Sequence, residues 1–322
     1  MKKFRGFKRV VCFLSALLLM AALAPALGEG SRGILYKVQN GNATVYLLGS
    51  IHVGNEEMYP FGAQIRQAME ASDTYVFECD TTSAEAMRVA REMMFFTDGT
   101  RLRDVISPEL FRKLEAACKK AKRSLKTMDT MHPWAAMAEL AMYVAAAEMG
   151  AENARNPVSQ GVETMVRAFA AEKGARFGYL ETVQGQLANM ADMSAALQEY
   201  LLEEALVAIL EPESVQGMDA TMRHWPGWWA AGDSASFVEN YRANYLSDNL
   251  TEGAAELLAE YHNTMVTLRN QTMADRVDSY LQGNDGHVYF ITVGLLHLVL
   301  PEDSIVTNLR ERGYQVKTLS ER

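Results

Sequence analysis

Residues 44–52 are TVYLLGSIH and residues 288–297 are VYFITVGLLH, and these two stretches decide the fold of the 322-residue chain. Each begins with a run of apolar, largely β-branched or aromatic residues, which is typical of a buried strand. Each run leads into Gly-x-x-His, as Gly49–His52 and Gly294–His297. If both strands belong to one α/β sheet, these residues lie at its carboxyl edge, where ligands bind. The repetition is either a duplicated structural unit or a coincidence of short patterns.

Outside these two units the chain alternates strand and helix patterns. An Asn-Gly turn after residue 39 predicts a hairpin between a strand at 34–38 and the strand at 44–48. Apolar runs bounded by turn residues predict further strands at 74–78, 176–180, 288–293 and 315–319. Helical patterns cover 61–71, 84–95, 108–122, 133–149, 161–173, 183–210, 234–245, 253–281 and 301–312.

This order predicts a single α/β domain over residues 29–322. We expect a mixed sheet that is flanked by many helices and closed by the two ends of the chain, with a strand-Gly-x-x-His unit near each end. The helical middle, about 81–285, is alternatively an inserted subdomain. Since no Pro- or Ser-rich linker marks its boundaries, we favour one domain.

Residues 1–28 have the composition of a secretory signal peptide. The basic stretch Met1–Arg9 precedes the apolar run Val10–Leu27, and small residues follow near Gly28. We therefore expect a secreted or extracytoplasmic protein. The alternative is an uncleaved N-terminal anchor with membrane association, because this run approaches the roughly 18 apolar residues of a spanning helix.

Charge and cysteine content narrow the class of protein. The formal net charge is −9, and residues 1–28 hold five Lys or Arg and no acid, so residues 29–322 carry −14. A chain this acidic offers no electrostatic basis for binding nucleic acid. Cys79 and Cys118 are too few for a disulfide framework; either one bridge or two buried thiols fits.

The histidines of the two motifs need a carboxylate to form a metal site. Two imidazoles and one carboxylate from separate strand ends are the minimum ligand set of a catalytic zinc- or manganese-type centre. The candidates are Glu78 and Asp80, in the acidic end of an apolar run, where strand alternation places them on one face and Cys79 on the other. Alternatively, Glu78 pairs with an arginine and Asp80 caps the next helix.

Further polar residues are placed to support such a site. Glu181 follows the strand at 176–180, so it is either part of the site or a carboxylate in the first turn of the next helix. Arg269 and Asn270 lie at the edge of an apolar helical stripe, where they donate hydrogen bonds into the site or face solvent. Gly49 and Gly294 indicate either positive φ or a close approach by another group.

Other conspicuous residues are interpreted as structural. The cluster Trp225-Pro226-Gly227-Trp228-Trp229 is more typical of core packing at a helix start than of a substrate platform. The 19 methionines fall mostly on apolar helical positions, so they are interpreted as gap-filling core residues. The remaining histidines share no consistent neighbourhood and are interpreted as structural or surface residues: His132, His224, His262 and His287.

Taken together, the motifs resemble the TraB/GumN family. That family includes the Tiki metalloproteases and is distantly similar to erythromycin esterase and to the haem-binding ChaN proteins. The segments that carry the resemblance are LLGSIHVGNEEMYPF (47–61), VFECD (76–80), LETVQGQ (180–186), LRNQTMADRV (268–277) and VGLLHLVLPEDSIVTNLRERGYQV (293–316).

The resemblance implies an α/β fold in which both Gly-x-x-His motifs and the acidic strand end converge on one site. It implies a metal-dependent peptidase with His52 and His297 as ligands and Glu78 as ligand or catalytic base. Arg269 and Asn270 match the family's Arg-Asn pair. We therefore expect an exported hydrolase in which a divalent ion, Mn, Co or Zn, activates water toward a peptide or small-molecule substrate. The alternative is a non-catalytic protein that binds haem, a metal ion or peptide in the same cleft.

Overall fold

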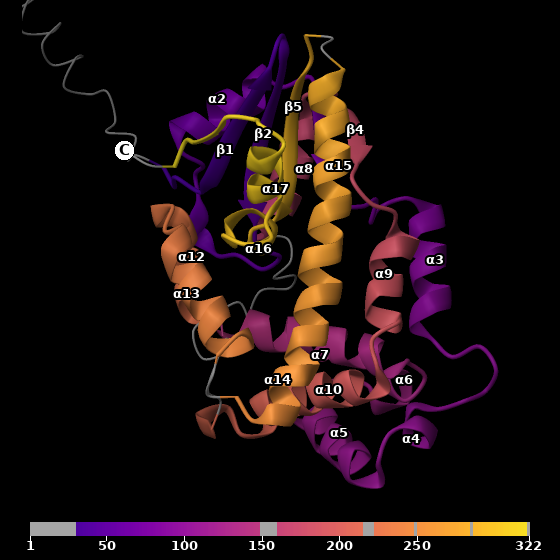
Figure 1. The fold of residues 1–322 in the computed structure, drawn as a ribbon. Coiled ribbons are helices and arrows are strands. Elements are labelled where there is room, and N and C mark those ends of the chain that lie inside the picture. The colour runs from indigo at the N-terminus through magenta and orange to yellow at the C-terminus, as the bar shows by residue number, and fades with distance from the viewer. Residues whose placement is uncertain (1–29, 149–159, 215–221, 248–249, 284–285, 321–322) are drawn as a thin grey trace, which may run out of the picture.

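A computed structural model describes residues 30–148, 160–214, 222–247, 250–283 and 286–320 (Figure 1). Residues 1–28, the predicted signal peptide, lie outside these ranges. The centre is one six-stranded sheet in the order β4-β3-β5-β2-β1-β6. All six predicted strands are present, with small shifts at their ends. They are β1 (Ile34–Asn40), β2 (Ala43–Ser50), β3 (Thr74–Phe77), β4 (Arg176–Tyr179), β5 (Val288–Gly294) and β6 (Val316–Thr318).

The sheet is mixed, as predicted. Strands β4, β3, β5 and β2 are parallel neighbours, whereas β1 pairs antiparallel with both β2 and β6. The central parallel strands are almost fully buried, which explains their continuous apolar runs. Gly41 has φ 55° in the turn between β1 and β2, a conformation that favours glycine. Strand β6 pairs with β1 and forms one edge of the sheet, so the first and last strands of the described chain lie side by side.

Helices cover both faces of this sheet (Figure 1). Helices α15 (Leu268–Gln282) and α17 (Ile305–Glu311) lie on one face, and α2 (Ala63–Ala71) and α8 (Val162–Glu172) lie on the other. Neighbouring residues of β5 illustrate the division. Tyr289 packs on Tyr280 of α15, and Phe290 packs on Tyr75, which contacts Phe169 of α8. The prediction of an α/β domain is therefore confirmed.

A second hydrophobic cluster lies in the helices below the sheet in Figure 1. It is built by α4 (Leu102–Val105), α5 (Pro108–Lys120), α6 (Leu125–Met128), α7 (Pro133–Glu148) and α10 (Ala195–Leu210), and we call these helices the helical layer. The other helices are α3 (Ala84–Met94), α9 (Val183–Ala191), α12 (Trp225–Ala231), α13 (Ser234–Tyr245), α14 (Glu252–His262) and α16 (Leu296–Val299), with short turns at Glu56–Met58, Pro212–Ser214 and Met222–His224.

Three helix predictions need correction. The helix expected at 183–210 is interrupted before Ser194, whose side chain caps α10 by accepting from the Leu197 amide. The helix expected at 253–281 contains a π-helical turn, Asn263–Thr267, between α14 and α15. The helix expected at 301–312 begins only at Ile305, after the capping residue Ser304. Apolar spacing continues across the first two of these positions, so periodicity alone did not reveal them, whereas residues 301–304, Pro-Glu-Asp-Ser, lack that spacing.

The structure also decides between the two cysteine alternatives. Cys79 and Cys118 are both free and buried. Cys118 lies in α5, whereas Cys79 follows β3, so no bridge joins them. Within the described ranges, no helix combines the length and the apolar composition needed to cross a bilayer.

Candidate active site

Each of the four parallel strands is followed by a candidate site residue. His52 follows β2, Glu78 follows β3, Glu181 follows β4 and His297 follows β5. Parallel strands end at the same edge, so this topology gathers residues that are far apart in the chain. The two Gly-x-x-His motifs lie at the ends of the neighbouring strands β2 and β5. The two motif glycines are offset by one residue, because Gly294 pairs with Ser50 and not with Gly49.

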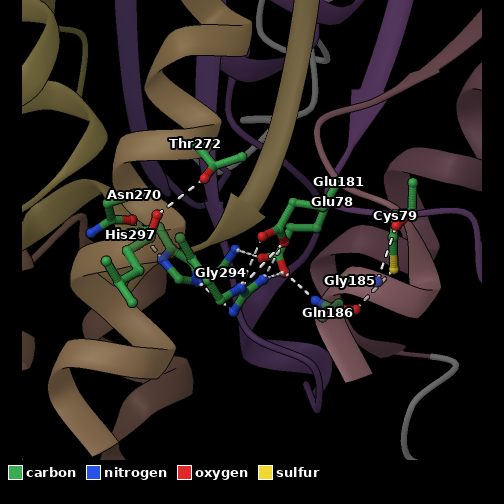
Figure 2. Close-up of polar contacts among 12 residues, drawn as sticks. Glu78, Cys79, Glu181, Gly185, Gln186, Asn270, Thr272, Gly294 and His297 are labelled. Carbon is green, nitrogen blue, oxygen red and sulfur yellow. Dashed lines mark hydrogen bonds and ion pairs between the residues drawn. The ribbon is translucent and has the colours of Figure 1, made fainter. Parts of the chain in front are cut away.

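Both carboxylate oxygens of Glu78 accept hydrogen bonds within the site. It is 6% exposed, and its Oε1 accepts from the Gly294 amide at 2.6 Å. Its Oε2 accepts from Arg269 Nη2 at 2.7 Å and from Gln186 Nε2 at 2.8 Å. Burial alone would raise the pKa of Glu78, but the Arg269 charge, helped by the Gly294 hydrogen bond, outweighs it and the pKa is lowered to about 2. Glu78 is therefore an ionised carboxylate that is fixed in orientation (Figure 2).

Arg269 of α15 joins two carboxylates at the centre of the site. Its Nη2 lies 2.7 Å from Oε2 of both Glu78 and Glu181, and its side chain is 6% exposed. Nη1 lies 3.1 Å from His297 Nε2. The structure thus buries Arg269, and the two acidic strand ends share its single charge.

His297 is held in one tautomer by its neighbour on α15. Asn270 Nδ2 donates to the Asp303 carbonyl at 2.6 Å, so its Oδ1 faces the imidazole. His297 Nδ1 lies 2.7 Å from that oxygen and carries the proton, which leaves a lone pair on Nε2. Burial, reinforced by Arg269, lowers the pKa of His297 to about 3, so the ring is neutral.

His52 completes the group from the other side of a cavity. The cavity has a volume of about 560 Å³ and is lined by His52, Glu78, Arg269 and His297. Unlike His297, His52 is exposed. The structure therefore brings both motif histidines and Glu78 to one cavity.

Close approach, and not positive φ, explains the two motif glycines. A Cβ on Gly49 would lie 3.0 Å from Leu295 Cβ and 3.1 Å from its Cα. A Cβ on Gly294 would lie 3.3 Å from Glu78 Oε1. A side chain at Gly294 would therefore crowd the carboxylate that its own amide hydrogen-bonds.

Asp80 lies away from this group. Its Oδ1 accepts from the amides of Thr82 and Ser83, just before α3 begins. Strand β3 ends at Phe77, so the alternation that was expected to place Asp80 beside Glu78 does not extend that far. Asp80 lines a second groove, which meets the site cavity at Arg269 and also contains Glu181. The alternative, that Asp80 caps the next helix, is also wrong, because Ser83 caps α3 by accepting from the Ala86 amide, while Asp80 orders the turn before it.

Sequence reasoning missed two polar contributions. Gln186 of α9 bonds Glu78, and its Oε1 lies 2.8 Å from Cys79 Sγ. Its position in the first turn after a strand end was the available signal. His262 lies 2.8 Å from the Tyr241 hydroxyl and 3.0 Å from Asp303 Oδ2. These partners lie 21 and 41 residues away in the chain, so no local pattern indicated them.

The chemistry of the donors fits a divalent metal ion in part. His297 presents an unprotonated Nε2 and is oriented through Nδ1 by an amide oxygen, as metal-binding histidines are. Glu78 is ionised, and His52 adds a second imidazole to the same cavity. Arg269, however, hydrogen-bonds both His297 Nε2 and Glu78 Oε2, and in the described residues no three His, Cys, Asp or Glu side chains form a ready metal cluster.

Comparison with known proteins identifies the family. The profile of the TraB/PrgY/gumN family matches residues 34–318. Metalloprotease TIKI1 of Danio rerio is 23% identical over 305 residues, which cover 84% of this chain and 60% of the relative. Metalloprotease TIKI2 of Xenopus tropicalis is 23% identical over 331 residues, which cover 91% of this chain and 61% of the relative.

The matched regions span three fifths of these relatives' lengths, 60% and 61%. No solved structure is a significant match to this chain. The family profile extends from β1 to β6 and so includes all four strand ends that form the site. The chain belongs to the TraB/PrgY/gumN family.

Proposed function

We propose that this protein is a metal-dependent hydrolase that cleaves peptide bonds. The observation that carries the proposal is the meeting of His52, Glu78 and His297 at one cavity from three parallel strand ends. The relatives named metalloproteases support the same chemistry. In this proposal the three side chains hold one divalent ion, Mn, Co or Zn, and the substrate is a peptide or a small molecule with a comparable bond. Nucleic acid is not a partner, given the acidic chain.

A divalent ion at this place supplies Lewis-acid activation of a carbonyl group and of water. Binding it requires Arg269 to release His297 Nε2 and Glu78 Oε2, while its contacts with Glu181 can remain. Asn270 then keeps His297 in the tautomer that leaves Nε2 free.

Glu78 and Arg269 have complementary tasks in this proposal. If Glu78 is not a ligand, it would be the general base that accepts a proton from water, because it is ionised and fixed by the Gly294 amide. Arg269, positioned by Glu181, can stabilise the negative charge that develops on the scissile carbonyl oxygen.

We propose in addition that the protein is exported. Residues 1–28 would act as a cleaved signal peptide or, if uncleaved, as a membrane tether. Mass spectrometry of protein from the native host should then find an N-terminus near residues 27–29. A membrane-bound form that retains Met1 would contradict cleavage.

Glu78→Gln, which keeps the shape and removes the charge, tests the hydrolase proposal. If Glu78 is the base, turnover of a peptide library should fall about 10²- to 10⁴-fold with most metal retained. If it is a ligand, metal content and turnover should fall together. The His52→Ala variant should lose both metal and turnover. Metal content is measured by elemental analysis, and turnover is measured by mass spectrometry of the products. Asp80→Asn, the neighbouring carboxylate outside the cluster, is the matched control and should change neither.

Wild-type protein that binds the metal but hydrolyses no peptide, ester or amide would contradict this proposal. It would favour a non-catalytic protein that binds haem, a metal ion or peptide. The contacts of Arg269 with Glu78 and His297 are the observation that favours this second candidate, because they satisfy these groups without an ion.

A further inference from the structure

The site cavity continues into a region rich in methionine. It lies between the carboxyl edge of the sheet and the helical layer, since its wall includes Ser50 of β2, Ala141 of α7 and Leu201 of α10. Most of its lining is apolar. Six methionines contribute: Met137, Met142, Met190, Met193, Met222 and Met265. Methionines interpreted from the sequence as core filling therefore face an open cavity.

Aromatic rings form another part of the wall. Trp225 packs edge-on against Phe237, with centroids 5.6 Å apart and an interplanar angle of 71°. Tyr241 and Tyr245 are stacked, with centroids 4.8 Å apart and an angle of 4°. All four residues line the cavity. Rigid rings beside flexible thioethers are suited to apolar groups of varied shape.

Two polar atoms in this wall are buried without a hydrogen-bond partner in the described part of the chain. They are Ser50 Oγ and Trp225 Nε1, and Ser50 is only 2% exposed. A buried donor or acceptor without a partner is costly, so such atoms in a cavity are suited to bind a ligand. An indole N–H donates only, whereas a hydroxyl both donates and accepts. Together they complement the carbonyl and the N–H of a peptide group.

We propose that this cavity is the substrate side-chain pocket and that it selects a large, flexible apolar residue, such as Met, Leu or Phe, next to the scissile bond. The apolar side chain lies among the methionines and rings, while Trp225 Nε1 donates to a backbone carbonyl and Ser50 Oγ accepts from a backbone N–H. This inference rests on the proposed peptidase function. The volume of about 560 Å³ falls in the range of small-molecule sites and accommodates more than one residue.

Binding, measured apart from turnover, tests the pocket. The probe is a series of fluorescein-labelled hexapeptides that differ at one central position: Leu, Met, Phe, Ala, Asp or Lys. Affinities are measured by fluorescence polarisation on the full-length Glu78→Gln protein. The Leu, Met and Phe peptides should bind at least about 10-fold more tightly than the Ala, Asp and Lys peptides. Equal affinities, or a preference for Lys directed by Glu204 on α10, would overturn the proposal.

Filling the pocket supplies the structural control. Ala141→Phe places a ring in the cavity and should weaken binding of the Leu peptide about 10-fold or more, with little effect on the Ala peptide. Ala243→Phe, on α13, is exposed and outside the cavity, so it should change neither affinity. If Ala141→Phe does not fold, Ala138→Leu on the same wall replaces it. Unchanged selectivity in a folded cavity variant would overturn the proposal.

The two polar atoms make a different prediction. Ser50→Ala and Trp225→Phe should weaken the binding of every peptide by a similar factor, about 3- to 10-fold. The reason is that Ser50 Oγ and Trp225 Nε1 contact the peptide backbone and not the variable side chain. Decanoate is added as a competitor for the labelled peptides. If decanoate binds more tightly than every peptide, or if neither variant has an effect, a peptide pocket is excluded. Because no step requires hydrolysis, selective binding without turnover would refute the peptidase and retain the pocket.

Discussion

At the residue scale, the site depends on one arginine shared by two buried carboxylates. Arg269, Glu78 and Glu181 are each less than one tenth exposed in their side chains. Three such charges are tolerable only because both carboxylates are hydrogen-bonded to the arginine between them, since an isolated buried ion is strongly destabilising. The same contacts keep Glu78 ionised, which links the stability of the site to its chemistry.

Arg269→Met should therefore be severely destabilising. Removing the guanidinium leaves Glu78 and Glu181 facing each other without a countercharge, and the free energy of unfolding should fall by about 3–5 kcal/mol. Urea unfolding followed by circular dichroism measures the change. The matched control is Arg88→Met, because Arg88 also bonds two carboxylates, Glu85 and Glu92, but on an exposed helix surface. That variant should be nearly neutral.

The double variant Arg269→Met, Glu181→Gln should recover part of the loss, because it removes one of the two unpaired charges. A double variant less stable than Arg269→Met alone would show that repulsion between the carboxylates is not the cause. The sequence placed Arg269 near the site, but its partners come from β3, β4 and β5, so their pairing was not predictable from local pattern.

At the element scale, the end of β2 must pass close to the chain that leaves β5. The contact between Gly49 and Leu295 fixes this crossing, and Gly294 and His297 follow from it. This contact explains Gly49, and the contact with Glu78 Oε1 explains Gly294, although neither glycine has positive φ.

Gly49→Ala should separate these two elements. The added Cβ meets Leu295 backbone and Cβ atoms, which cannot rotate away, so the cost should be about 1–3 kcal/mol. Gly253→Ala in α14 is the control, because no atom lies within 4 Å of its added Cβ, and it should be neutral or slightly stabilising. The melting temperatures of the two variants, measured by thermal unfolding, are compared. Equal melting temperatures would mean that Leu295 can shift without cost.

Elements were more predictable from the sequence than their junctions. All six strands were found because each combines an apolar run with clear turn residues. The break at Ser194 and the π-helical turn Asn263–Thr267 were missed, since apolar residues continue at helical spacing through both in the sequence. Glu78, His52 and His297 were located by their positions at strand ends. The methionine-rich part of the site cavity was not located from the sequence. A methionine that faces a cavity has the same helical spacing as a methionine in a core.

At the scale of the whole molecule, two hydrophobic clusters meet around the site. One lies between the sheet and its covering helices, and the other lies within the helical layer. The cavity lies between them, with walls from both. The chain enters the helical layer after β3, leaves it to form β4, and returns to it with α10. We predict that the helical layer can open while the sheet stays folded, because it has a hydrophobic cluster of its own.

Matched leucine truncations should reveal this asymmetry. Leu206 of α10 and Leu47 of β2 are both fully buried, and each Leu→Ala change should cost about 2–5 kcal/mol. In hydrogen–deuterium exchange, Leu206→Ala should speed exchange in α5, α7 and α10 and leave β2, β3 and β5 protected, because the helical layer can open alone. Leu47→Ala should speed exchange in the sheet and the helical layer together. If Leu206→Ala exposes the central strands equally, the molecule opens as one unit, and the cavity cannot widen by movement of the helical layer alone.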